Sequence, residues 1–100
     1  MTVHHPEQAS RTDEQRKADV AAAIKAKYPT AQSYEVYSSD QSNSGYELGE
    51  VMLDDGTELI DEELAEAVWE DLIWLRWGAF GDRNSDSQFE VDITTGRMLD

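Results

Sequence analysis

The sequence predicts an α+β fold, with two helices packed on a small antiparallel sheet of three to four strands in the order α-β-β-(β)-α-β. Two segments repeat apolar residues at helical spacing, and shorter segments rich in tyrosine, valine and isoleucine have the composition of strands. Polar turns separate these segments. A length of 100 residues fits one domain. Residues 1–11 have no periodic pattern and are expected to form a flexible tail, so the domain is expected over residues 12–100.

The first helix is expected over residues 13–28. Thr12 and Gln15 have the spacing of a capping box, in which each side chain binds the backbone N–H of the other residue. The apolar positions of this helix repeat every four residues and are Val20, Ile24 and Tyr28. Pro29 cannot continue a helix, so the helix should end before it.

Four segments are expected to form the strands. Residues 32–38 and 46–53 predict an antiparallel hairpin, and an Asp-Gly pair after them favours a tight turn into a short strand over 57–60. Residues 88–93 alternate apolar with acidic side chains, which is the clearest strand pattern in the chain.

A second helix is expected to begin after Asp61, which can cap it, and to run to about Trp77. Its aliphatic stripe should face the sheet and consists of Leu64, Val68, Leu72 and Leu75. A second apolar stripe consists of Trp69, Ile73, Trp77 and Phe80. That stripe either packs under the first helix or remains open as a docking face. Trp74 lies on neither stripe.

An acidic row lies beside the tryptophans on this helix and consists of Glu62, Glu63, Glu66 and Glu70. Like charges one turn apart repel each other, and the helix dipole favours only those in the first turn. Residues 47–71 contain 11 acidic residues and no lysine or arginine. Carboxylates that lead into indole rings suit a basic partner with arginines, through ion pairs and cation–π contacts. A plain solvated helix face is the alternative.

The charge of the chain excludes several classes of partner. The formal net charge is −14, and residues 29–100 hold 18 acidic residues against three arginines. Such a field repels nucleic acids and anionic membranes and attracts basic protein surfaces. Its size exceeds the charge of about 2–8 that keeps a small domain in solution. The start of the chain has no signal-peptide pattern and no stretch has the length of a membrane span, so a cytoplasmic protein is expected.

The residues needed for catalysis or metal binding are scarce. The chain has no cysteine, and its two histidines, His4 and His5, fall in the expected tail. Asp82, Asn84 and Asp86 match the first three ligand positions of a calcium loop, but Ser87 and Ile93 stand where that loop needs glycine and glutamate. A polar turn is therefore preferred there to a weak cation site. We expect no enzyme activity, no cofactor and no metal.

Two likenesses can be stated. The segment "QFEVDITTGRML", residues 88–99, resembles the closing strand and turn of PepSY-type modules, and we infer no function from it. In composition, the chain is similar to the small acidic inhibitors of phages and mobile elements that imitate nucleic acid.

The sequence thus favours a non-enzymatic interaction protein that docks on a basic protein surface. The expected partner is a nucleic-acid-binding protein, and the specific form is a DNA-mimic inhibitor of the anti-restriction or anti-CRISPR kind. The expected contact residues are Glu62, Glu63, Glu66, Glu70, Trp69, Trp74 and Trp77. The alternative is a homo-oligomeric accessory protein, such as a homodimer, that uses the tryptophan helix as its interface, with acidity serving solubility only.

Overall fold

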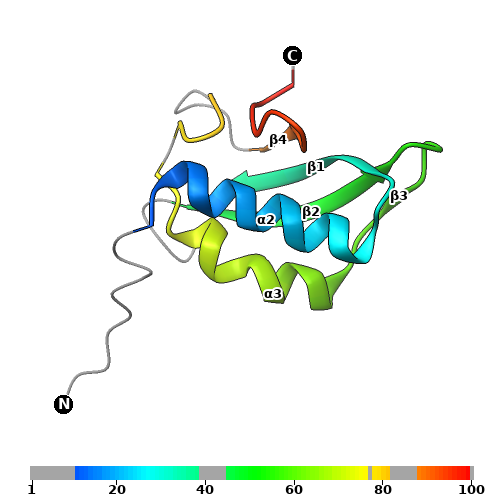
Figure 1. The fold of residues 1–100 in the computed structure, drawn as a ribbon, viewed down its shortest axis with the longest axis horizontal. Coiled ribbons are helices and arrows are strands. Elements are labelled where there is room, and N and C mark those ends of the chain that lie inside the picture. The colour runs from blue at the N-terminus through cyan, green and yellow to red at the C-terminus, as the bar shows by residue number, and fades with distance from the viewer. Residues whose placement is uncertain (1–10, 39–44, 77, 82–87, 100) are drawn as a thin grey trace.

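The computed structural model describes residues 11–38, 45–76, 78–81 and 88–99. Its elements are α2 (Asp13–Lys27), β1 (Ala31–Ser38), β2 (Tyr46–Leu53), β3 (Glu58–Leu59), α3 (Glu62–Ile73) and β4 (Gln88–Asp92) (Figure 1). The predicted α+β class and the order of its elements are confirmed. Most of the expected tail, including both histidines, lies outside the described residues.

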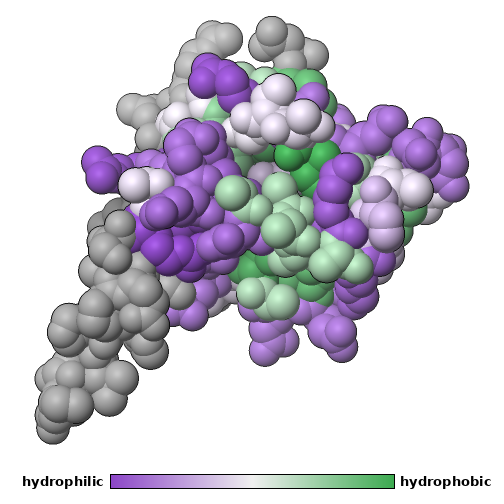
Figure 2. All heavy atoms as spheres, viewed as in Figure 1, coloured by the Kyte–Doolittle hydropathy of each residue, from purple (hydrophilic) through white to green (hydrophobic). Residues whose placement is uncertain are grey.

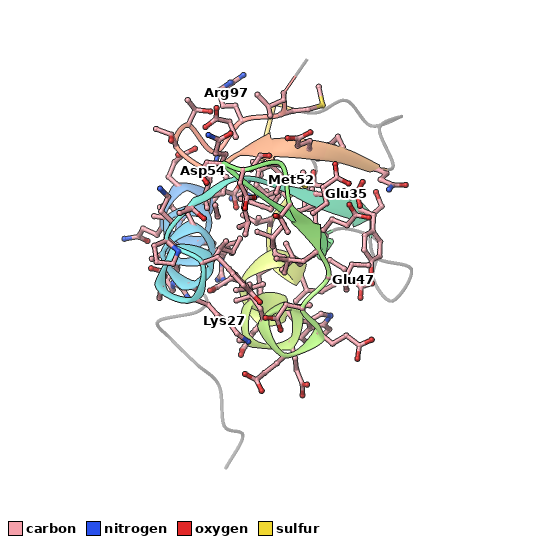
Figure 3. All side chains as sticks on the ribbon, turned by 90° about the vertical axis from the view of Figure 1, so that its right-hand side faces the viewer. Lys27, Glu35, Glu47, Met52, Asp54 and Arg97 are labelled. Carbon is pink, nitrogen blue, oxygen red and sulfur yellow. The ribbon has the colours of Figure 1, made fainter. Side chains whose placement is uncertain are left out.

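The four strands form one antiparallel sheet in the order β3-β2-β1-β4. β1 lies in the interior of the sheet, where Tyr34 pairs with Val51 of β2 and with Val91 of β4. The short third strand is smaller than predicted, because only Glu58 and Leu59 pair with β2. Both helices lie on the same side of the sheet, so the fold has two layers (Figures 1 and 3). Within the described ranges, neither helix has the length and apolarity needed to cross a bilayer.

The core lies between the sheet and the helices. The predicted aliphatic stripe of α3 is buried throughout, at Leu64, Val68 and Leu72 and at Leu75 just beyond the helix. α2 adds Val20 and Ile24, which are fully buried as their spacing predicted. The capping box at the start of α2 is also present.

The outward face of α2 is built from small side chains. Ala18, Ala22 and Ala26 are exposed at a spacing of four residues. Figure 2 shows weakly hydrophobic surface along this helix, bordered by hydrophilic residues. The contribution of α2 to the core therefore depends on its inward residues, since the outward alanines bury little.

α3 is shorter than predicted, because it ends at Ile73 rather than near Trp77. The Leu75 N–H donates to the Leu72 carbonyl oxygen at 3.2 Å, an i to i−3 bond that tightens the last turn. The chain then bends at Gly78, whose φ is +90° and whose N–H donates to the Tyr46 hydroxyl at 3.0 Å. The predicted second stripe therefore does not continue along one helix.

Phe80, expected on that stripe, lies instead in the core. Its ring is fully buried and meets the rings of Tyr46, Phe89 and Tyr34 edge-on, at centroid distances of 5.1, 5.9 and 6.4 Å. Aromatic pairs in this geometry add about 0.5–1.5 kcal/mol beyond their buried area. The interior position of Phe80 explains why the chain leaves the helix before reaching it.

Lys17 is buried beside this aromatic cluster. Its Nζ donates to the carbonyl oxygens of Ala79, at 2.8 Å, and Gly96, at 3.0 Å. It also lies 3.0 Å from a Glu14 carboxylate oxygen and 5.7 Å from the Phe80 ring centroid. One ammonium group thus links α2, the loop after α3 and the turn after β4.

Replacing Phe80 should cost much of the stability of the fold. We expect Phe80→Ala to lower the free energy of unfolding by about 3–5 kcal/mol, because it removes a ring from a closed core. Urea denaturation measures this loss. Ile60→Ala is the control, since Ile60 is 67% exposed and its truncation should change the free energy by less than about 0.5 kcal/mol. Similar losses in both variants would contradict the assignment.

Candidate partner-binding surface

The start of α3 is fixed by Asp61. One carboxylate oxygen accepts the Leu64 N–H at 2.9 Å, as the predicted N-cap requires. The other accepts the Tyr28 hydroxyl at 2.6 Å and lies 2.7 Å from the Lys27 Nζ. The bonds from Lys27, then Tyr28, then the Leu64 backbone hold the pKa of Asp61 well below its usual value. The end of α2 and the beginning of α3 are therefore joined at one charged group.

The end of α3 is held close to the start of β2. Gly45 has a φ of +94°, and a Cβ placed on it would lie 2.2 Å from the Ile73 carbonyl oxygen. Only glycine fits there, on both conformational and steric grounds. The backbones of the helix and the strand therefore approach each other directly at this end, which places the flank of α3 next to β2.

The acidic row of α3 faces solvent. Glu62, Glu63, Glu66 and Glu70 are all exposed. Glu63 lies 3.3 Å from the Lys27 Nζ, whereas the other three have no ion-pair partner among the described residues. Apart from Glu63, the row is therefore uncompensated among the described residues.

A hollow of about 440 Å³ separates the flank of α3 from the sheet. Its lining comes from three elements and consists of Tyr37, Glu47, Leu48, Ala65, Glu66 and Trp69. Trp69 is 40% exposed, while Leu48 is buried beneath. Figure 3 shows Glu47 on the side of the molecule away from α2. The hollow therefore combines an apolar floor, two aromatic rings and two carboxylates, which is a chemistry suited to a cation.

Trp74 has different neighbours from Trp69. Its side chain is 54% exposed, and its ring centroid lies 5.3 Å from the guanidinium carbon of Arg16 on α2. The same arginine lies 3.8 Å from Asp71, and Arg11 reaches that carboxylate at 2.6 Å as an ion pair. Residues 47–71 contain no lysine or arginine, but Asp71 has counter-charges from two arginines near the start of α2. Trp77 lies outside the described residues.

A second acidic group spans three neighbouring strands. The pKa of Glu50 on β2 is raised, first by a hydrogen bond with Glu58 of β3, then by partial burial and by the charges of Glu58 and Glu35. Glu35 lies on β1, opposite Glu90 of β4. Glu50 and Glu58 belong to the acidic segment 47–71 of the sequence, whereas Glu35, Tyr37 and Leu48 were not among the predicted site residues. The alternation of polar and apolar residues in β1 was the available signal for Glu35.

The candidate calcium ligands Asp82, Asn84 and Asp86 lie outside the described residues. Within the part that the structure describes, no group of three or more histidine, cysteine or acidic side chains is arranged to hold a metal ion.

Comparison of the chain with protein-family models, curated proteins and solved structures gives no significant match in any of the three. What the surface can bind is therefore inferred from its own chemistry.

The anchoring role of Asp61 predicts a dependence of stability on pH. Because its folded pKa is depressed, Asp61 contributes stability above its ordinary value of 3.8, and this contribution is lost as the pH falls towards the folded value. The free energy of unfolding of the wild type should therefore fall more steeply below about pH 4 than that of Asp61→Asn. Denaturation at a series of pH values measures the slopes. Glu62→Gln is the control for the loss of one carboxylate at the same helix end, and a wild-type slope in Asp61→Asn would contradict the role.

The carboxylates of the strands predict the opposite dependence of stability on pH. A raised folded pKa means that the stability linked to Glu50 is present below its ordinary value of 4.5 and is lost as the pH rises through the folded value. Glu50→Gln should therefore raise the free energy of unfolding at pH 7, with a smaller gain near about pH 4. Asp54→Asn is the control for general charge reduction. An equal gain at both pH values, or a loss at pH 7, would contradict the repulsion.

Proposed function

We propose that this chain is a non-enzymatic interaction protein that docks on a basic protein surface through the outer flank of α3. One observation carries the proposal: Glu66 and Trp69 of α3 line a single hollow with Glu47 of β2. Tryptophan is among the commonest anchors of protein interfaces, and surrounding charges set encounter rate and register. Acidic groups around an exposed indole are thus what a basic partner requires.

The overall charge supports a nucleic-acid-binding protein as the partner. With a net charge of −14, the chain imitates the negative charge by which nucleic acid is attracted to such proteins. The row of Glu62, Glu66 and Glu70 presents about one carboxylate per 6 Å of helix. In the specific form that we propose, the chain is a DNA mimic that occupies a groove otherwise filled by phosphates, as an anti-restriction or anti-CRISPR inhibitor would.

The test uses two variants that lose the same charge at different places. Immobilised wild-type chain should capture nucleic-acid-binding proteins from a bacterial lysate at low salt, and duplex DNA or molar salt should release them. The double variant Glu66→Gln, Glu70→Gln should capture them about tenfold less, as the loss of two interfacial ion pairs predicts. The double variant Asp54→Asn, Asp55→Asn should keep wild-type capture. Capture that competing duplex DNA does not reduce, or an equal loss of capture in the two double variants, would count against the proposal.

The alternative of a homo-oligomer makes a separate prediction for the same residues. Trp69 and Trp74 contact different neighbours, which favours separate contacts over one continuous apolar interface. We expect sedimentation equilibrium to give a monomer mass over a wide concentration range. A dimer that dissociates in Trp69→Ser would instead support the homo-oligomer.

A further inference from the structure

We propose that the hollow beside Trp69 is a receptor for an arginine side chain of the partner. This inference rests on the proposed function and specifies the group that the acidic face recognises. The occupant needs a positive charge for the carboxylates, a flat surface for the indole and an aliphatic stem for the floor. Arginine has all three, and its guanidinium is weakly hydrated and stacks on aromatic faces.

The lining of the hollow meets each part of that side chain. Leu48 and Ala65 provide apolar surface for the stem, and Trp69 provides an exposed ring for the guanidinium plane. Glu47 and Glu66 come from different elements, so a cation between them is approached from both the sheet and the helix. Among the residues that the structure describes, no lysine or arginine lines the hollow. Its charge is therefore complementary to a cation supplied from outside.

The other flank of α3 shows the same chemistry with its cation in place. There the Arg16 guanidinium lies 5.3 Å from the Trp74 ring centroid and 3.8 Å from the Asp71 carboxylate. Indole, carboxylate and guanidinium thus already combine within this chain. In the hollow, the Trp69 indole and the Glu66 carboxylate are present on the same helix, and we expect the partner to supply the guanidinium.

The size of the hollow is consistent with one side chain and its adjoining backbone. About 440 Å³ falls within the range of about 300–1,000 Å³ that is usual for ligand pockets. Lysine fits the hollow less well, because its compact and strongly hydrated ammonium cannot stack on the indole. A neutral side chain of the same shape leaves both carboxylates unpaired.

The experiment compares three blocked pentapeptides, Gly-Gly-X-Gly-Gly, in which X is arginine, lysine or citrulline, the neutral analogue of arginine. Each is titrated into the full chain while NMR records the indole N–H signals, and the spectrum of Trp69→Phe assigns the Trp69 signal. We expect a saturable shift of that signal with the arginine peptide, weaker binding of the lysine peptide and no shift with citrulline. Glu66→Gln should weaken arginine binding about three- to fivefold, the loss expected for an exposed ion pair.

Glu63→Gln is the matched control, because it removes an exposed glutamate of the same helix that does not line the hollow. It should change the affinity by less than about twofold, since surface ion pairs outside the hollow contribute little. A citrulline peptide that shifts Trp69 as strongly as arginine, or a Glu63→Gln effect equal to that of Glu66→Gln, would overturn the receptor.

The two proposals fail in different ways. A chain that captures nucleic-acid-binding proteins but shows no Trp69 response to the arginine peptide overturns the receptor and leaves the proposed function in place. A chain that binds the arginine peptide in the hollow but captures no such protein supports the receptor and overturns the proposed partner.

Discussion

The arrangement of the molecule depends on the aliphatic stripe of α3, which has to lie on the sheet. Leu64, Val68 and Leu72 are almost fully buried. Burying a side chain of this kind contributes about 1.5–3 kcal/mol, whereas an exposed ion pair contributes about 0–1 kcal/mol. Because an α-helix has 3.6 residues per turn, turning this stripe inward places Glu66 and Trp69 on the flank beside β2. Core packing therefore decides which chemistry α3 presents to solvent.

Many of the cations in the described part of the chain form internal ion pairs, and these cations lie on the side of the molecule that carries α2. Those cations belong to α2 or stand just before it and are Arg11, Arg16, Lys17 and Lys27. The carboxylates that they neutralise are above all Asp61, the N-cap of α3, and Asp71 within that helix, and both meet cations of the α2 side. Glu35 and Glu47 lie on the side of the molecule away from Lys27 (Figure 3). These ion pairs therefore leave Glu66 and Glu70 of α3, like Glu35 and Glu47 of the strands, without a cation from this group.

The sequence was sufficient for features set by local chemistry, which include the two helix caps, the aliphatic stripe and the order of the elements. It was insufficient where two distant segments meet. Helical periodicity does not tell where a helix ends. α3 ends before Phe80 because that ring packs in the core against Tyr34 and Tyr46. The hollow likewise brings Glu66 of α3 close to Glu47 of β2. Periodicity predicts which residues share a face of one element, but it does not predict which faces of two elements meet. The clustering of acidic residues in sequence therefore anticipated the charge of the surface but not its shape.

The buried ammonium of Lys17 has a consequence for how the chain reaches this structure. It bonds to Ala79 and Gly96, which lie 62 and 79 positions further along the chain. β1 likewise completes its pairing only when β4, near the other end of the domain, is in place. Contacts of such long sequence separation slow folding, because the entropy of closing large loops is lost before the contacts form. During synthesis, the first helix therefore emerges well before the strand that completes its environment, so the nascent polypeptide gains its cooperative stability only once residues 88–96 have left the ribosome.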